Sequence, residues 1–310
     1  MSAIVVGVDA GGSRTRAMVA DETGKEIVTV EGGPSAARPG EIERAADTIA
    51  ATIKDALAAC DMSHVVPKVL CVGAAGAGRE AEREGLWQAL MGRDVAEDIV
   101  VHPDAMIALD DAFGEGAGLM VISGTGSVGF GRGPAGAFAR CGGWGPVCGD
   151  EGSGAWIGRK ALSIVTGSYD GREPETLLVG AILTAAEVNE VADLVAWGAQ
   201  ATPATLATLA PVVLSVAQGG DLRANSLVTI AVEELVLHAR TLARQLFGDE
   251  RAAVPLALGG GLLAKGSLLR KRMVSRLKTA VPGAQLREEE VVPVRGAVRG
   301  ALRLLGAETP

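Results

Sequence analysis

The sequence predicts an α/β protein built from two lobes. Its 310 residues exceed the usual size of one domain. Short apolar runs typical of strands alternate with segments of helical spacing, as in a layered α/β domain. An apolar run, a turn of small residues and a returning strand occur at the N-terminus and again from Leu119, which indicates that one structural device is used twice.

The first lobe is predicted to hold residues 1–113. The turn 21–24 ends in glycine and joins two apolar runs, which is typical of a hairpin. Later segments alternate between a helical spacing of apolar residues and short apolar runs. The predicted strands are 4–8, 16–20, 25–30, 68–72 and 99–102, and the predicted helices are 42–59 and 80–91.

The second lobe is predicted to hold residues 114–295 and to be richer in helix. The segment 296–310, helical over 296–305, is expected to pack back on the first lobe. No low-complexity tract separates the lobes, so the boundary near residue 113 is predicted to be a hinge. The predicted strands of this lobe are 119–122, 128–132 and 254–258, and its predicted helices are 155–166, 174–196, 203–217, 225–246 and 267–279.

Composition excludes several classes of function. The formal net charge of -8 disfavours a nucleic-acid surface, which needs clustered Lys and Arg, so a small-molecule ligand is expected. The four cysteines form no CxxC pair, and no His-rich cluster accompanies them, which disfavours a zinc or redox site. The sequence holds no apolar run long enough to span a bilayer and no basic leader, so no membrane partner and a cytoplasmic location are expected.

Two turns of small residues indicate a phosphate-binding device. The Walker A pattern is absent. Residues 124–129 match GxGxxG, but a dinucleotide fingerprint needs a helix there, and 130–134 continue as strand and turn. A plain hairpin turn remains an alternative. Two such turns, each after a first strand, favour a pair of hairpins whose backbone N–H groups hold phosphate oxygens.

The segment 140–153 has the composition of a sugar-binding loop. It places Trp144, Asp150 and Glu151 on a backbone with five glycines. An indole can stack on the apolar face of a sugar, and carboxylates can accept from its hydroxyls. Two alternatives stay open: Trp144 could cap a core, and the acidic pair could be solvated or could cap the helix expected from Ala155.

These motifs resemble those of a known superfamily. Residues 9–15 and 123–127 resemble the two phosphate motifs of the sugar kinase, actin and heat-shock ATPase superfamily, and 258–261 resemble its adenosine motif. Within it, 142–145 followed by 149–153 is similar to the N-acetylglucosamine kinases of the BadF/BadG/BcrA/BcrD ATPase group. The resemblance implies an actin-like ATPase fold of two duplicated ribonuclease H-like domains with a cleft between the lobes.

The resemblance also implies roles for individual residues. Asp104 would be the catalytic base, although a residue between Pro103 and a helix is also a good N-cap. Asp9 would hold Mg²⁺ through water; its alternative is a turn-forming residue before glycine. The implied phosphate contacts are Gly11, Gly12, Ser13, Thr15, Gly124, Thr125 and Gly126; the nucleotide pocket would use Ala217, Gly259, Gly260 and Gly261; and the sugar would contact Gly143, Trp144, Gly145 and Asp150.

One departure from the family pattern concerns the acceptor. The family has a sugar-contacting asparagine after a Gly-Pro-Ser-like stretch, but here residues 33–35 are followed by Ala36, Ala37 and Arg38. A lost amide removes a hydrogen bond of about 1 kcal/mol, which would retune the choice of amino sugar without abolishing phosphoryl transfer.

The expected function is ATP- and Mg²⁺-dependent phosphorylation of an amino sugar, with N-acetylglucosamine converted to its 6-phosphate. Glucosamine and N-acetylmuramic acid are alternative acceptors. Two alternatives belong to other classes: an ATPase activator of a 2-hydroxyacyl-CoA dehydratase, which would need placed cysteines, and a non-catalytic sugar sensor. The resemblance also allows a homodimer, since members of the family are often dimers.

Overall fold

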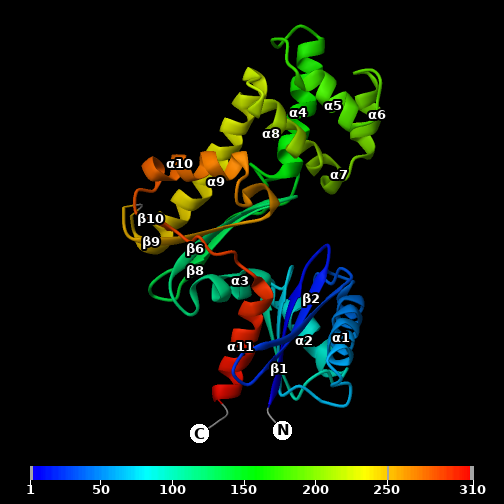
Figure 1. The fold of residues 1–310 in the computed structure, drawn as a ribbon, viewed down its shortest axis with the longest axis vertical. Helices are drawn as coiled ribbons and strands as arrows, with labels where there is room; N and C mark the ends of the chain where they lie inside the picture. Colours follow the sequence, from blue (N-terminus) through cyan, green and yellow to red (C-terminus); the bar gives the residue numbers. More distant parts are fainter. Residues whose placement is uncertain (1–2, 250, 308–310) are drawn as a thin grey trace. The chain divides into compact units, whose positions relative to one another are not determined.

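The computed structural model describes residues 3–249 and 251–307, which form two compact units (Figure 1). Unit 1 contains the described residues up to Gly116 together with those from Glu290 onward. Unit 2 contains Ala117–Glu289. Residues 1, 2 and 308–310, which belong to the predicted first lobe and C-terminal segment, lie outside the described residues.

Unit 1 is built on a five-stranded sheet of order β3-β2-β1-β4-β5. The first three strands form an antiparallel meander, and β4 and β5 run parallel to β1. Val6 and Val8 of β1 face one core cluster and Val5 faces another, so the central strand is buried on both sides. The strands are β1 (Ile4–Ala10), β2 (Thr15–Asp21), β3 (Glu26–Gly32), β4 (Val69–Ala74) and β5 (Asp98–Pro103).

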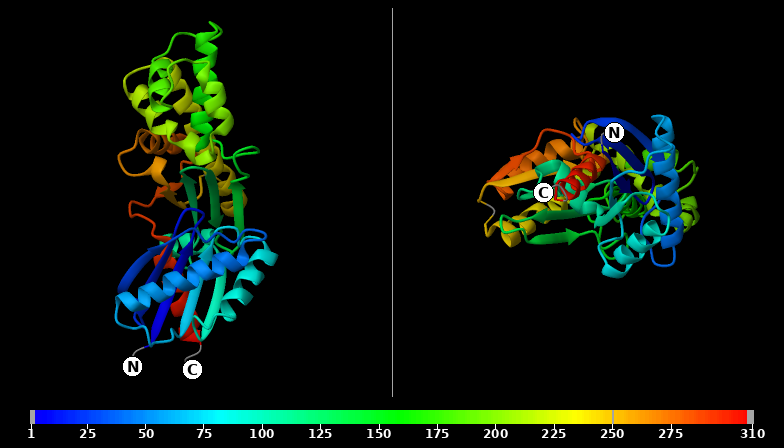
Figure 2. Two further views of the ribbon diagram at one scale, coloured as in Figure 1. Left: turned by 90° about the vertical axis from the view of Figure 1, so that its right-hand side faces the viewer. Right: turned by 90° about the horizontal axis from the view of Figure 1, so that it is seen from below.

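Helices cover both faces of this sheet (Figure 2). The helices α1 (Ile42–Ala59) and α2 (Glu80–Met91) cover one face, while α3 (Asp104–Phe113) and α11 (Pro293–Ala307) lie together on the other. Close approach of α11 requires glycine, because a Cβ on Gly7 would overlap the backbone of α11 and a Cβ on Gly296 would overlap that of α3. The C-terminal helix therefore completes the core of unit 1.

Unit 2 repeats the same strand order. Read from β8, its sheet has the order β8-β7-β6-β9-β10, with an antiparallel meander β6-β7-β8 and with β9 and β10 parallel to β6. The identical sequence of connections in the two units is the mark of a duplicated fold. The strands are β6 (Gly118–Ser123), β7 (Ser127–Arg132), β8 (Phe138–Gly142), β9 (Val254–Gly259) and β10 (Ala284–Leu286).

The helices of unit 2 share one large core that includes Leu119 and Val121 of β6. The long α9 packs on the antiparallel strands and on α10. The helices are α4 (Gly154–Tyr169), α5 (Leu178–Ala185), α6 (Asp193–Gln200), α7 (Pro203–Ala207), α8 (Leu209–Gln218), α9 (Leu222–Phe247) and α10 (Leu268–Ala280), with a short 3₁₀ turn at Gly261–Leu263.

The structure corrects two predicted helices and adds three elements. The continuous helix predicted over 174–196 is wrong: α5 ends at Ala185, and Glu187 has a positive φ of 56°. The helix predicted over 203–217 is divided between α7 and α8 at Thr208. The elements α3, β8 and β10 were not predicted, since β8 and β10 are short and α3 follows a proline directly.

Within the described ranges, no single helix has both the length and the apolar character of a membrane span. One pair of segments, Pro203–Gln218 and Leu222–Phe247, passes the same test together but is bent by 119°.

Candidate functional site

Two acidic residues meet at one edge of the unit 1 sheet. The parallel register aligns Asp9 of β1 with Gly73 of β4, and Gly73 with His102 of β5. Asp104 comes two residues after His102, as the first residue of α3. Because parallel strands end at the same edge, Asp9 and Asp104 lie at the carboxyl edge of the sheet, which is the usual place for ligands in open α/β sheets.

The two carboxylates interact electrostatically. Burial, and then the nearby negative charge of Asp104, raise the pKa of Asp9 to about 6, while Arg16 and Arg14 oppose this shift. A buried carboxylate that faces another carboxylate favours a cation or a proton between them. Among the described residues, no group of three or more His, Cys, Asp or Glu could hold a metal. Magnesium that keeps water and takes phosphate oxygens needs only one or two carboxylates, so Asp9 fits it.

Asp104 does not have the role of the helix N-cap. Pro103 occupies that position, and the Asp104 carboxylate accepts a hydrogen bond from the backbone N–H of Ala105, with N and Oδ1 2.9 Å apart. The predicted base is therefore presented at the beginning of a helix, where its position is fixed by the packing of α3.

The first turn, residues 11–14, joins β1 to β2 and is closed by a hydrogen bond from Gly11 N to Arg14 O at 2.9 Å. Gly12 and Ser13 are exposed and available to a ligand. Thr15 is not: it is fully buried, and its hydroxyl bonds to Gly33 O and to the hydroxyl of Ser35, both at 2.5 Å. We therefore remove the Thr15 side chain from the phosphate contacts and assign it to holding the 33–35 segment.

The second turn, residues 124–126, is the counterpart in unit 2. Gly124 N donates to Gly126 O at 2.9 Å. The carbonyls of Gly124 and Thr125 accept from Gly154 N and Ala155 N at 2.8 and 3.1 Å, so the beginning of α4 is bound to the turn. The side chain of Thr125 is exposed, as a ligand contact requires.

Two serine hydroxyls attach the second turn to the acidic segment that follows the tryptophan loop (residues 143–149). Ser123 Oγ donates to Gly152 O at 2.9 Å, and Ser127 Oγ donates to Glu151 O at 2.7 Å. These hydroxyls are buried inside unit 2. The phosphate-like turn and the sugar-like segment are thus one rigid piece, which the sequence did not indicate.

Asp150 lies against this turn. A Cβ on Gly126 would come within 2.8 Å of Asp150 Oδ2, and the other oxygen accepts from Gly145 N at 3.2 Å. Burial raises the pKa of Asp150, and the hydrogen bond from Gly145 partly offsets this effect. The N-cap of α4 is Ser153, which accepts from Trp156 N, so the alternative that Asp150 caps the helix is wrong.

Trp144 does not cap a core. It is 72% exposed, and the guanidinium of Arg140 lies 4.9 Å from the centre of its ring. Gly143 and Gly145 on either side have φ of 70° and 88°, which only glycine adopts readily. The tryptophan loop therefore presents an indole to solvent from a backbone bent on both sides.

His238 on α9 lies beneath the tryptophan loop. It is 6% exposed, and its ring lies so close to Gly142 that a Cβ at that position would overlap it. Its Nδ1 is buried and has no hydrogen-bond partner. Burial lowers the pKa of His238, while Glu151 and Asp150 oppose the shift. The sequence predicts no role for this histidine, and no motif could have identified it, because only the fold brings α9 under the loop.

The third glycine turn follows β9. Gly260 has a φ of 85°, and a Cβ there would overlap the carbonyl of Ser123, whereas Gly261 has open space around it. Gly259 ends β9 beside β6. Ala217 is buried in the core at 3% exposure, and its carbonyl accepts from Asn225 Nδ2 at 2.9 Å. Its side chain is therefore unavailable to a nucleotide.

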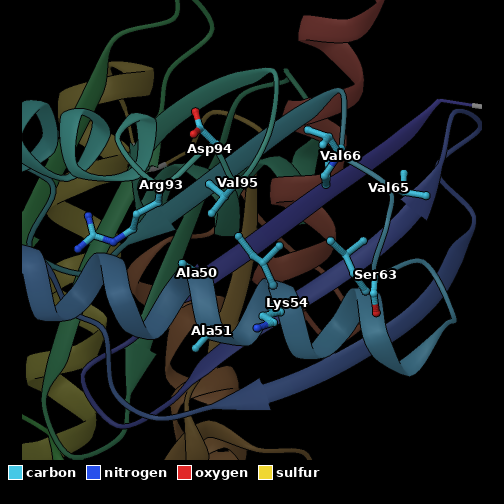
Figure 3. A pocket seen from close by; sticks show the side chains of 12 residues that line it. Ala50, Ala51, Lys54, Ser63, Val65, Val66, Arg93, Asp94 and Val95 are labelled. Atoms are coloured by element: carbon cyan, nitrogen blue, oxygen red, sulfur yellow. The ribbon is translucent and has the colours of Figure 1, made fainter.

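A cavity of about 370 Å³ in unit 1 does not belong to this site (Figure 3). Lys54, Val66 and Val95 are among the residues that line it. The segments 65–67 and 93–95 precede β4 and β5, so the cavity lies at the amino edge of the sheet, opposite Asp9 and Asp104.

The chain is similar to several known proteins over most of its length. The model of the BadF/BadG/BcrA/BcrD ATPase family matches residues 6–301. The N-acetylmuramic acid/N-acetylglucosamine kinase of Clostridium acetobutylicum is 32% identical over 83% of this chain and 84% of its own length. The N-acetyl-D-glucosamine kinase of Dictyostelium discoideum is 26% identical over 96% of this chain and 98% of its own.

Among solved structures, a protein of Chromobacterium violaceum provisionally named an N-acetylglucosamine kinase matches with a TM-score of 0.78 at 28% identity. The match covers 96% of this chain and 98% of that one. Together with the repeated sheet order, these findings confirm the predicted α/β class and actin-like ATPase fold.

Proposed function

The chain belongs to the BadF/BadG/BcrA/BcrD ATPase family, and on that premise we propose that it transfers a phosphoryl group from ATP to an amino sugar. N-acetylglucosamine, phosphorylated at its 6-hydroxyl, is the first candidate acceptor. The relatives named above are amino-sugar kinases, which supports this choice. The observation that carries the proposal is the pair Asp9 and Asp104 at one sheet edge, where burial, and then the negative charge of Asp104, raise the pKa of Asp9.

In the proposed reaction, Asp104 accepts the proton of the attacking hydroxyl as the new O–P bond forms and the bond to the leaving ADP oxygen breaks. The hydroxyl becomes the bridging oxygen of the sugar phosphate, and its proton ends on the Asp104 carboxylate before passing to solvent.

The glycine turns provide donors to the phosphates. Gly12 and Ser13 in unit 1 and Thr125 in unit 2 are exposed on their turns, where backbone and hydroxyl groups can reach oxyanions. Asp9 would hold Mg²⁺ through water, and the ion would supply charge neutralisation to the triphosphate. The adenosine is assigned to Gly259, Gly260 and Gly261.

The acceptor is assigned to the tryptophan loop. The exposed indole of Trp144 offers an apolar surface to the ring, and Asp150 offers oxygen atoms to hydroxyls. Gly143 and Gly145 give the loop the backbone geometry that presents them. The serine hydroxyls next to the second turn bind the backbone of Glu151 and Gly152, directly after Asp150. Asp150 in turn accepts from Gly145 N, so hydrogen bonds link the proposed acceptor and phosphate contacts of unit 2.

The proposal is tested by incubating the purified protein with ATP, Mg²⁺ and a panel of amino sugars: N-acetylglucosamine, glucosamine and N-acetylmuramic acid. We expect sugar-dependent ADP release. Asp104→Asn should lower kcat by a factor of about 10²–10⁴ with little change in KM for ATP. Asp94→Asn is the matched control, because Asp94 is exposed at the opposite edge of the same sheet. Absence of ADP release with every sugar refutes the proposed function.

A further inference from the structure

The segment 33–38 is fixed against the first turn of unit 1. Ser35 N donates to Gly11 O at 3.0 Å, and Ala37 N donates to Ala75 O at 2.8 Å, just beyond the end of β4. Gly76 fits this arrangement only as glycine, since a Cβ there would overlap the carbonyl of Ala37. The segment therefore lies at the carboxyl edge of the sheet, beside the turn that follows Asp9.

Its side chains leave one polar group for a ligand. Ser35 is buried, and its hydroxyl is bonded to that of Thr15. Gly33, Pro34, Ala36 and Ala37 offer no polar side chain. Arg38 remains, so a substrate group that meets this segment can be recognised through a side chain only by a guanidinium.

The guanidinium of Arg38 lies beside the first turn, and little negative charge nearby offsets its positive charge. A Cβ on Gly12 would lie 3.7 Å from Arg38 Nη2. The acid paired with Arg38 is Glu41, at 3.9 Å from Nη1, and Glu41 makes a closer pair of 2.7 Å with Arg44. By contrast, Arg16 pairs with Glu31 at 2.7 Å. The Arg38 side chain is 61% exposed, so a ligand can reach it.

From this arrangement we infer that Arg38 binds an oxyanion of the substrates, and specifically the carboxylate of an acid-bearing amino sugar such as one with a 3-O-lactyl group. The planar guanidinium suits a carboxylate, which it can hold with two hydrogen bonds. In the proposed reaction the acceptor hydroxyl approaches Asp104, which follows β5 at the same sheet edge as the segment 33–38, so other substituents of the sugar can meet this segment. This inference rests on the proposed function and adds a specificity-determining residue to it.

The test compares kcat/KM for N-acetylmuramic acid, for its uncharged amide and for N-acetylglucosamine, in the wild type and in Arg38→Ala. We expect Arg38→Ala to lower kcat/KM about 10-fold or more for the acid, and less than about twofold for the two neutral sugars. Arg38→Lys should restore part of the loss. Arg44→Ala is the matched control, since Arg44 pairs with the same Glu41 and is 59% exposed.

The same measurements identify the source of the oxyanion. If Arg38→Ala lowers kcat about equally with all three sugars and raises KM for ATP, the oxyanion is the transferred phosphoryl group and the carboxylate assignment is wrong. If Arg38→Ala matches Arg44→Ala with every substrate, the inference fails as a whole. A wild type that is active on N-acetylglucosamine in that case leaves the proposed function intact, whereas a wild type inactive on all three sugars refutes the function itself.

Discussion

Asp111 on α3 accepts two hydrogen bonds from the guanidinium of Arg295 on α11, with Nε 3.1 Å from Oδ1 and Nη2 3.0 Å from Oδ2. The same carboxylate accepts from Val292 N at 2.7 Å. The Asp111 side chain is fully buried, while that of Arg295 is 44% exposed. Since α3 begins at Asp104, these bonds help to set the position of the proposed base.

Asp111→Ala is expected to lower the free energy of unfolding by about 2–4 kcal/mol, because it leaves a cation and a backbone N–H without their shared acceptor. Urea denaturation measures the change. Asp170→Ala, which removes an exposed pair with Arg172, is the control and should cost less than about 1 kcal/mol. Equal stability of the two variants would contradict this role for Asp111.

Asp9→Asn is expected to stabilise the protein without divalent cations while it lowers kinase activity. An unfolded Asp titrates near 3.8 and the folded Asp9 at about 6, so between these values the folded state binds more protons. Relative to Asp9→Asn, the wild type should therefore lose stability as the pH rises from 4 to 6, by up to about 3 kcal/mol, and no more above that.

Urea denaturation in EDTA from pH 4 to 7.5 tests this sign. The stability of the Asn variant minus that of the wild type should grow as the pH rises from 4 to 6 and should reach about 1–3 kcal/mol at pH 7.5. Asp94→Asn, at the opposite edge of the sheet, should follow the wild-type curve. If the free energies of unfolding of the wild type and of Asp9→Asn change with pH in parallel, the charge of Asp9 does not destabilise the folded state.

Trp144→Ala is expected to weaken the acceptor interaction alone. Loss of ring stacking should raise KM for the sugar about 3- to 10-fold, with KM for ATP unchanged. Because Trp144 is 72% exposed, the free energy of unfolding of Trp144→Ala should differ from that of the wild type by less than about 0.5 kcal/mol. Tyr169→Ala, at 71% exposure, is the control for loss of an exposed aromatic ring. A normal sugar KM in Trp144→Ala would remove the indole from the site.

Gly260→Ala and Gly261→Ala should differ sharply although the residues are adjacent. Alanine at 260 would be strained at a φ of 85° and would overlap the Ser123 carbonyl, so we expect a cost of about 2–4 kcal/mol and a raised KM for ATP. Gly261 has no neighbour within 4 Å of the added atom, and its variant should lose less than about 1 kcal/mol. Thermal unfolding compares the stability of the two variants, and activity at varied ATP concentration compares their KM for ATP.

Local patterns predicted most of the fold. The helices α1 and α2 begin and end where their apolar spacing indicated, and the repeated strand-turn-strand pattern corresponds to β1–β2 and β6–β7. The break after α5 was not predictable from periodicity, because apolar spacing continues through residues 186–192 while the backbone there leaves the helix, with Glu187 at a positive φ.

For the candidate site, the sequence marked Asp9 and Asp104 as acids at the ends of predicted strands, while their proposed roles came from the resemblance to the family and stay predictions. The site was not predictable where tertiary contacts decide the role of a side chain. Thr15 was expected among the phosphate contacts, yet its hydroxyl is hydrogen-bonded to that of Ser35 in the interior. His238 is separated from Gly142 by almost a hundred residues, and only the packing of α9 brings the two together.

Unit 1 is interrupted in the chain, whereas unit 2 is continuous. During synthesis, all of unit 2 is made before α11, so the sheet face around Gly7 stays uncovered until α11 has been added. Assembly of the unit that holds Asp9 and Asp104 is thereby postponed until unit 2 has been made, and a chain that stops before Pro293 would lack the helix that covers this face of the sheet.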